Sequence, residues 1–295
     1  MKFYPSRLIP SIADLERSIS VSAVSGGAQR KGRPSQREKI WRRRATFMAT
    51  LVCVPFGYGA EKASLSQHPS VGQHLVPADV NWDHPVYETT FDDASILQDW
   101  RLEGGKRMSI EGGNLVLESE EGQSSNHLVA WLNKEMPADF LLEFTVRPLN
   151  RRRGLNIIFF STRGSGGESI FDPSLAPRTG VFRQYHSSDL NGYHISYWAG
   201  SRGKANIRKN AGFKLVAAGP DRIMDAAPDA LQVVRVYKRG GTIRLIVDDI
   251  VSAAWDDDGR THGPVWDHRG WIGLRQMGHT VRCEYGYLKV FPCKR

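Results

Sequence analysis

Cysteine is scarce in this chain, with three residues in 295. Only Cys283 and Cys293 lie beyond residue 60, and both fall in one run that is expected to be a single strand. A strand advances about 3.3 Å per residue, which holds two Cα atoms ten positions apart far beyond disulfide reach. We therefore predict no intrachain disulfide. Two thiols without a neighbouring Cys or His also predict no zinc site.

Long apolar runs are missing as well. The run Ala45 to Tyr58 is shorter than the roughly 18 to 20 residues of a membrane span, and no other segment approaches that length. It follows the basic run Trp41 to Arg44 and precedes small and polar residues from Gly59 onward. This order predicts a signal peptide within 41–60 and a secreted or periplasmic protein without an integral membrane domain, with an uncleaved anchor as the alternative.

Almost all of the net positive charge lies at the N-terminal end of the chain. Residues 1–60 carry a net charge of +8, whereas residues 61–295 carry only +1 of the total of +9. Nucleic-acid binding needs a basic surface on the folded part, so we exclude a nucleic-acid partner. The composition predicts a disordered or mis-assigned extension over 1–40, a linker over 61–80 and one folded domain over 81–295.

Helical periodicity is rare in this domain, and β-rich runs separated by turn residues recur throughout it. Arg239-Gly240-Gly241 separates two such runs and predicts a hairpin. The pattern predicts an all-β sandwich of two antiparallel sheets, and the length favours a jelly roll over an immunoglobulin-like fold. The expected strands are 114–119, 127–132, 140–149, 154–162, 192–198, 204–210, 231–238, 242–249, 251–256, 271–277 and 280–291.

The stretch from Gly180 to Asn210 concentrates polar aromatic, basic and amide side chains on what we expect to be three successive strands. Alternate residues of a strand face opposite sides, so Tyr193, Ile195 and Tyr197 share one face and His194, Ser196 and Trp198 share the other. Such side chains suit a saccharide better than a dry core. For any single residue, however, a sheet whose polar groups are all hydrogen-bonded within the protein is an equally good explanation.

A series of motifs resembles the YesU-like family, also called domain of unknown function 1961. It runs from HLVAWL through GLNIIFFSTRG, FRQYHSSDLNGYHISYW and ANIRKN to WIGLRQMGHTVRCEYGYLKVF, within roughly residues 90–292. The resemblance implies a concanavalin A-like jelly roll in bacterial proteins often associated with polysaccharide utilisation. The family as a whole has no settled activity.

Glycans bind along the concave sheet in folds of this kind, which we treat as an analogy that the residues must support. The expected role is an exported carbohydrate-interacting protein, and an interaction domain without a glycan is a further possibility. Trp198 and Trp271 are additional aromatic candidates for sugar stacking. The predicted substrate-binding residues are Trp131, Arg183, Gln184, Tyr185, Tyr197, Asn206, Arg208, Asn210 and Gln276.

The alternative function is a polysaccharide lyase that acts on an acidic polysaccharide. A lyase needs a cation or amide beside the uronate carboxylate, a base for the C5 proton and an acid for the leaving oxygen. His186, Tyr193 and His194 are the candidate catalytic residues, close in sequence to Arg183 and Gln184. Whether the protein is an enzyme at all stays open at this point.

A glycoside hydrolase is less favoured because its paired carboxylates are not evident in one strand. The remaining carboxyl candidates are Glu143, Glu168, Asp172, Asp248-Asp249 and Asp256-Asp257-Asp258. We expect no cofactor or metal, with Ca²⁺ at the triple aspartate as a minor alternative. A histidine trio of His127, His279 and either His186 or His194 is a weaker metal candidate because no ligand spacing supports it.

Overall fold

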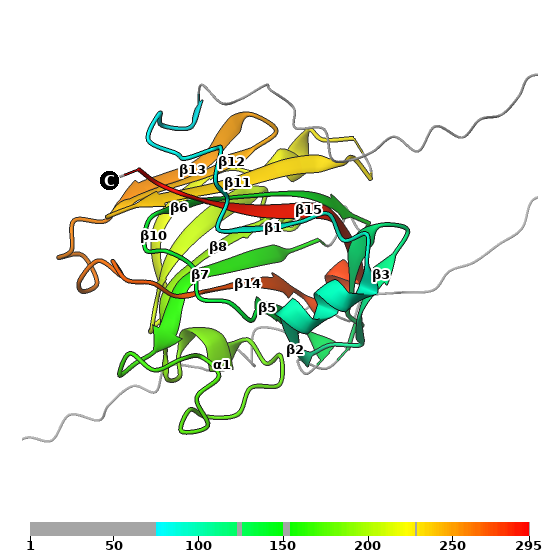
Figure 1. Ribbon diagram of the computed structural model, residues 1–295, viewed down its shortest axis with the longest axis horizontal. Helices are drawn as coiled ribbons and strands as arrows, with labels where there is room; N and C mark the ends of the chain where they lie inside the picture. The colour runs from blue at the N-terminus through cyan, green and yellow to red at the C-terminus, as the bar shows by residue number, and fades with distance from the viewer. Residues whose placement is uncertain (1–74, 123–125, 150–153, 228, 295) are drawn as a thin grey trace, which may run out of the picture. The chain divides into compact units, whose positions relative to one another are not determined.

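The computed structural model describes residues 75–122, 126–149, 154–227 and 229–294. The predicted extension over 1–40 and the signal peptide over 41–60 lie outside these residues. The described part is a sandwich of two antiparallel sheets (Figure 1), which confirms the predicted fold class. No helix in these ranges combines the length and the apolar character that crossing a membrane requires.

The first sheet has eight strands in the order β13-β12-β11-β6-β15-β4-β3, and β1 pairs with β15 beside this path. Its strands are β1 (Tyr87–Thr89), β3 (Arg107–Glu111), β4 (Asn114–Glu118), β6 (Phe140–Pro148), β11 (Gln232–Arg239), β12 (Thr242–Val247), β13 (Ile250–Asp256) and β15 (Arg282–Pro292).

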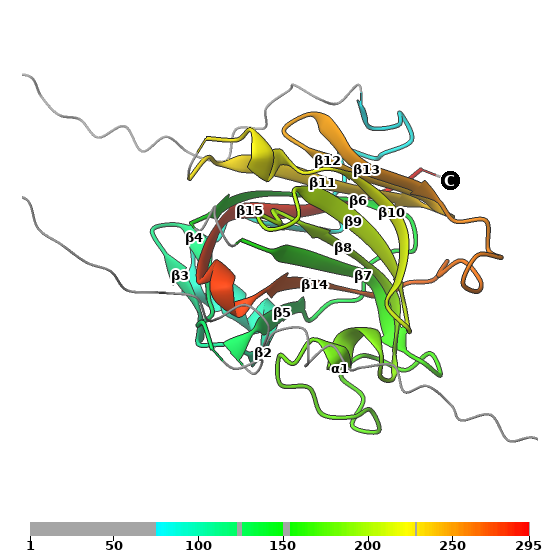
Figure 2. The same cartoon turned by 180° about the vertical axis from the view of Figure 1, so that it is seen from behind.

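The second sheet has seven strands in the order β10-β9-β8-β7-β14-β5-β2 (Figure 2). Its strands are β2 (Trp100–Gly104), β5 (Leu128–Leu132), β7 (Asn156–Gly164), β8 (Leu190–Tyr197), β9 (Lys204–Asn210), β10 (Lys214–Pro220) and β14 (Trp271–Gln276). Short helices connect some of the strands: η3 (Ala94–Asp99), α1 (Arg183–His186), η5 (Arg222–Met224) and η6 (Gly278–Thr280).

All the strands predicted from periodicity are present, and Gly240-Gly241 forms the tight turn between β11 and β12, with Gly240 at a φ of 49°. Four short strands were not predicted: β1, β2, β3 and β10. One prediction was wrong, because residues 183–186 form α1 instead of the first of three strands. Cys283 and Cys293 are free thiols, as predicted.

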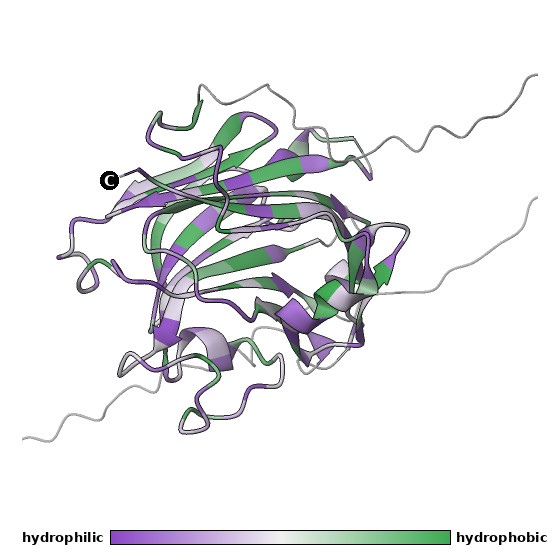
Figure 3. Cartoon of the chain, viewed as in Figure 1, coloured by the Kyte–Doolittle hydropathy of each residue, from purple (hydrophilic) through white to green (hydrophobic). Residues whose placement is uncertain are grey.

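The main core lies between the sheets, where alternate residues of each strand meet (Figure 3 shows the alternation of hydropathy along the strands). Ile158, Tyr193 and Ile195 from the seven-stranded sheet join Leu142 and Phe144 from the eight-stranded sheet in this core. The chain already packs before residue 81, since Val76 and Val80 are buried in a smaller cluster with Leu141 and Phe291. The packed part of the chain therefore begins earlier than the domain boundary expected from composition.

Candidate functional site

The seven-stranded sheet has a second face, turned away from the other sheet, which we call the outer face. Because Tyr193, Ile195 and Ile207 point into the sandwich, the residues between them point outward. These outward residues include hydrophobic ones in the middle of the sheet and polar ones on β8 and β9. They are Val129, Trp131, Ile157, Phe159, His194, Ser196, Asn206, Arg208, Asn210, Trp271 and Arg275.

Residues 165–189, which connect β7 to β8 and contain α1, lie over the hydrophobic half of the outer face (Figure 1). We call them the covering segment. Tyr185 and Ile170 are buried with Trp131, Phe159 and Trp271 in a second core. Trp131 is 0% exposed and its ring lies 5.5 Å from that of Phe159. Trp131 is therefore a packing residue in this structure, and no sugar can stack on it while the segment is in place.

Polar contacts hold the covering segment to the sheet. Arg178 donates to the Glu103 carboxylate at 2.8 and 3.2 Å, and Trp131 Nε1 donates to the same group at 3.0 Å. Gly180 has a φ of 91°, and a Cβ there would lie 2.0 Å from the carbonyl oxygen of His127. Only glycine fits at this close approach.

Gln184 and Tyr185, both predicted to bind substrate, brace the covering segment from within. Gln184 accepts a hydrogen bond from the Thr179 amide at 2.8 Å and donates to the Pro177 carbonyl at 3.3 Å. The Gly180 amide donates to the Tyr185 hydroxyl at 2.9 Å. Their polar groups are thus engaged within the protein.

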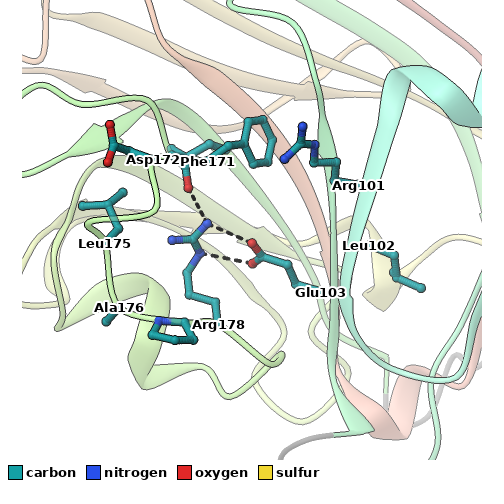
Figure 4. Close-up of a pocket in the computed structure, with 10 residues that line it drawn as sticks. Arg101, Leu102, Glu103, Phe171, Asp172, Leu175, Ala176 and Arg178 are labelled. Carbon is teal, nitrogen blue, oxygen red and sulfur yellow. Dashed lines mark hydrogen bonds and ion pairs between the residues drawn. The ribbon is translucent and has the colours of Figure 1, made fainter.

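A pocket of about 270 Å³ opens between the edge strand β2 and the covering segment (Figure 4). Figure 4 shows Arg178 between Glu103 and the main chain of the segment, with Arg101 on the opposite wall beside Phe171. The Arg101 guanidinium lies 4.4 Å from the centre of the Phe171 ring. The pocket is lined by Arg101, Leu102, Glu103, Ile170, Phe171, Asp172, Leu175, Ala176, Pro177 and Arg178.

The carboxylates considered for hydrolysis do not converge on this pocket. Asp172 lines it but accepts two hydrogen bonds from Ser174, which hold the pKa of Asp172 below its ordinary value. Glu168 accepts from the Gly166 amide within the segment. Glu143 belongs to β6 of the other sheet, where it is buried against Arg235 at 2.6 Å.

The polar half of the outer face carries a compact group of side chains beside α1, which we call the β8–β9 cluster: His186, His194, Arg208, Asn210 and Phe213. The Phe213 ring lies 4.3 Å from the His186 ring and 5.6 Å from the His194 ring. The Arg208 guanidinium lies 3.8 Å from the centre of the same ring. His186 and His194, both predicted from sequence, are thus brought together by Phe213.

Burial and positive charge keep both imidazoles neutral. The pKa of His186 is lowered to about 4, mainly by burial and further by Arg275, Arg208 and Arg183. The pKa of His194 lies well below its ordinary value, mainly through burial and then through Arg208. The His194 ring is 0% exposed, and its Nδ1 lies 3.0 Å from the Asn210 amide nitrogen. Nε2 of His194 has no hydrogen-bond partner among the residues described.

This environment predicts a pH-dependent stability. A histidine whose pKa is lower in the folded state contributes stability above its unfolded pKa, and that contribution is lost as the pH falls below about 6.5. We expect the free energy of unfolding in urea to decrease from pH 6.5 to 5 in the wild type. The slope of this free energy against pH gives the number of protons taken up on unfolding, and His194→Asn should lower that number by about one. The exposed His84→Asn is the control. An unchanged slope in His194→Asn contradicts the buried neutral imidazole.

Tyr193, the third predicted catalytic residue, lies on the other side of the sheet from the two histidines. Its hydroxyl donates to Asp257 at 2.7 Å and accepts from the Trp266 amide at 2.9 Å, inside the sandwich. Strand alternation causes this separation, since Tyr193 and His194 are successive residues. The structure therefore does not place a Tyr193 hydroxyl beside His186.

The other predicted binding residues divide between the outer face and the core. Asn206, Arg208 and Asn210 lie on β9 facing outward, and Arg183 is exposed at the start of α1. Tyr197 is buried in the main core, and Gln276 is buried and donates to the Ser119 hydroxyl at 2.7 Å. Trp198 departs from the expected alternation, because its φ of 54° turns the side chain into the main core with Tyr193 and Tyr197.

Three residues near the cluster were not predicted: Phe213, Arg275 and Arg202. Phe213 follows β9 in the sequence, and only the tertiary fold returns it to the histidines. Arg275 lies on β14, in the last of the motifs that resemble the family. It is four residues from Trp271 on the same strand, so alternation places both side chains on the same face, and this is the one sequence signal that points Arg275 outward. Arg202 donates from the β8–β9 turn to the Ser196 hydroxyl at 2.9 Å.

The described residues contain no group of three or more His, Cys, Asp or Glu side chains arranged to hold a metal ion. The three consecutive aspartates have separate partners. Asp256 pairs with Arg244 at 2.9 Å, Asp257 with Lys209 at 2.7 Å, and Asp258 accepts from the Thr261 amide at 2.7 Å. His127 Nδ1 is engaged by the Gly278 amide.

Residues 84–290 match the family model described as Domain of unknown function (DUF1961). Among curated proteins, the chain is 33% identical over 199 residues to the uncharacterized protein YesU of Bacillus subtilis. The matched region covers 65% of this chain and 89% of the relative. Among solved structures, it resembles a Bacillus subtilis protein of unknown function with a galectin-like fold. That likeness has a TM-score of 0.66 and 31% identity, and covers 73% of this chain and all of the other. The chain belongs to the DUF1961 family.

Proposed function

We propose that the protein binds carbohydrate on the outer face of the seven-stranded sheet, at the β8–β9 cluster. The observation that carries this proposal is the contact between the His186 and Phe213 rings, which lie 4.3 Å apart and are both partly exposed beside the polar side chains of β9. A sugar needs an apolar ring for its C–H groups and fixed donors and acceptors for its hydroxyls. The cluster offers both.

The rest of the outer face supports the same assignment by exclusion. Trp131, Phe159 and Tyr185 are covered, whereas the rings of Phe182, His186 and Phe213 contact one another and are all partly exposed. Ser196 and Asn206 are paired on β8 and β9, two residues along from the pair His194 and Arg208, and both are buried. We further infer from the apolar run within 41–60 that the protein is exported and meets its glycan outside the cytoplasm.

Affinity electrophoresis tests the proposal with a panel of neutral and acidic polysaccharides. We expect the wild type to be retarded by at least one of them, and Phe213→Ala to weaken that binding about tenfold or more, as expected for an aromatic anchor. Ile250→Ala removes a partly exposed apolar side chain from the other sheet and serves as the control. Equal retardation of Phe213→Ala and wild type would place the ligand elsewhere.

A polysaccharide lyase is the second candidate, favoured by the neutral imidazole of His186 among three arginines. In this reaction a base removes the C5 proton of a uronate, the C4–O bond breaks as a C4=C5 double bond forms, and the departing oxygen takes a proton. His186→Ala should then abolish the ultraviolet absorbance of unsaturated uronates while sparing much of the affinity. In a binding protein, the same change should only weaken affinity.

A further inference from the structure

We infer that the sugar bound by the β8–β9 cluster is anionic and carries a carboxylate or sulfate group that the arginines of this surface recognise. This inference rests on the proposed function and narrows it to a class of ligand. It is carried by the charges around His186 and His194, where three arginines lack the carboxylate partner that most other arginines of the described structure have.

Most arginines elsewhere in the described structure are paired with carboxylates, although Arg101 and Arg202 are not: Arg101 lies over the Phe171 ring and Arg202 donates to the Ser196 hydroxyl. Arg178 pairs with Glu103 at 2.8 Å, Arg235 with Glu143 at 2.6 Å and Arg282 with Glu118 at 2.9 Å. The arginines at the cluster are different. Arg183, Arg208 and Arg275 all act on His186 electrostatically, yet none of them forms an ion pair with a carboxylate in the described residues.

Arg275 is the most unusual of the three because it is 0% exposed. Its guanidinium lies 4.3 Å from the centre of the Phe182 ring and donates to the Gly180 carbonyl at 3.1 Å, and its Nε has no partner among the described residues. Burial lowers the pKa of Arg275 to about 9, so the side chain is still charged near neutral pH. A buried charge without a counter-ion acts strongly on its surroundings because little water screens it.

Arg208 offers the contact itself. Its Nη1 donates to the Phe213 carbonyl at 2.9 Å and its plane lies over the Phe213 ring, so the guanidinium is held in place. Its Nε and Nη2 form no hydrogen bond to a described residue. A guanidinium fixed in this way presents two parallel N–H groups, the geometry that matches a carboxylate or a sulfate.

A neutral sugar would gain little from such an arrangement. It would leave Arg183, Arg208 and Arg275 without a counter-charge and would bury part of the Arg208 guanidinium at a cost in hydration. An anionic sugar supplies the missing charge, and its ring can still lie against His186 and Phe213. The covering segment and β9 together therefore select for negative charge.

The test compares each polymer with a matched neutral form. Polygalacturonate is paired with its carboxyl-reduced derivative, and dextran sulfate with dextran, which separates a carboxylate from a sulfate as the recognised group. We expect one anionic polymer to bind at least about tenfold more tightly than its neutral counterpart. Arg208→Gln should lose about the same factor. Arg147→Gln on β6 makes the same charge change beside Glu284 on the other sheet and should bind like the wild type.

Each outcome decides between the two proposals. Equal binding of the reduced and native polymers would overturn the anionic ligand and leave carbohydrate binding intact. No retardation by any polymer would overturn both. An equal loss in Arg208→Gln and Arg147→Gln would reveal nonspecific charge attraction and also overturn the inference. Competition by free acetate or sulfate as strong as that by the polymer would show an adventitious ion only.

Discussion

Lys209→Met is expected to lower the free energy of unfolding by about 3 to 5 kcal/mol, the range for breaking a buried ion pair from one side. The Lys209 ammonium and the Asp257 carboxylate lie 2.7 Å apart, with side chains 1% and 0% exposed. Methionine preserves most of the aliphatic packing against Trp255 and Trp266 but leaves the Asp257 charge uncompensated between the sheets. Urea denaturation monitored by tryptophan fluorescence measures the loss.

Lys204→Met provides the control on the same strand, because Lys204 is exposed and its replacement should change stability by no more than about 0.5 kcal/mol. The double variant Lys209→Met/Asp257→Asn should be less destabilised than the two single changes added together, since the uncompensated charge is gone. A Lys209→Met protein as stable as the wild type would refute the buried pair. Glycan binding should survive in all variants that fold, because Lys209 points away from the outer face.

Trp131→Ala should have a comparably large effect, about 3 to 5 kcal/mol, through the cavity it leaves between the sheet and the covering segment. The indole packs against Phe159 and Tyr185 and donates to Glu103, which in turn holds Arg178. One substitution therefore removes both the packing under the segment and the hydrogen bond that positions Glu103 for Arg178. We expect faster proteolysis within 165–189 in addition to a lower unfolding midpoint.

Trp131→Phe separates the two contributions. It keeps an aromatic ring at this position but removes the Nε1 donor and part of the ring volume, so its loss should be about 1 to 3 kcal/mol, less than that of Trp131→Ala. Trp131 was also predicted from sequence to bind substrate. If Trp131→Phe reduced glycan affinity as strongly as Phe213→Ala does, the covered position assigned to this ring would be incorrect.

Most strands were predictable because every second residue faces a core and is apolar, which leaves a period of two in the sequence. The missed strands β1, β2 and β3 are short and partly exposed, and β10 is an edge strand with Leu215 half exposed, so none shows a clear period. The segment 183–186 was wrongly predicted to be a strand because its helical turn depends on the Thr179, Gly180 and Pro177 contacts of a folded loop. Local propensity contains no information about such contacts.

The candidate site was predictable in part. Alternation separates Tyr193 from His194, but it does not reveal which of the two faces the sandwich, because that depends on how the partner sheet packs. His186, His194, Arg208 and Asn210 were predicted and do meet. Phe213 and Arg275 complete the surroundings, and no pattern in the sequence links either of them to α1.

The strands β7 and β8 are hydrogen-bonded antiparallel neighbours, and a turn of a few residues would suffice to join them. The chain instead inserts residues 165–189 at this point. Since the sheet does not need this length for its register, the insertion serves the outer face that it covers and not the strand pairing. Exchanging its exposed part between relatives, with Gly180, Tyr185 and Arg178 kept, should alter ligand preference without disturbing the sandwich.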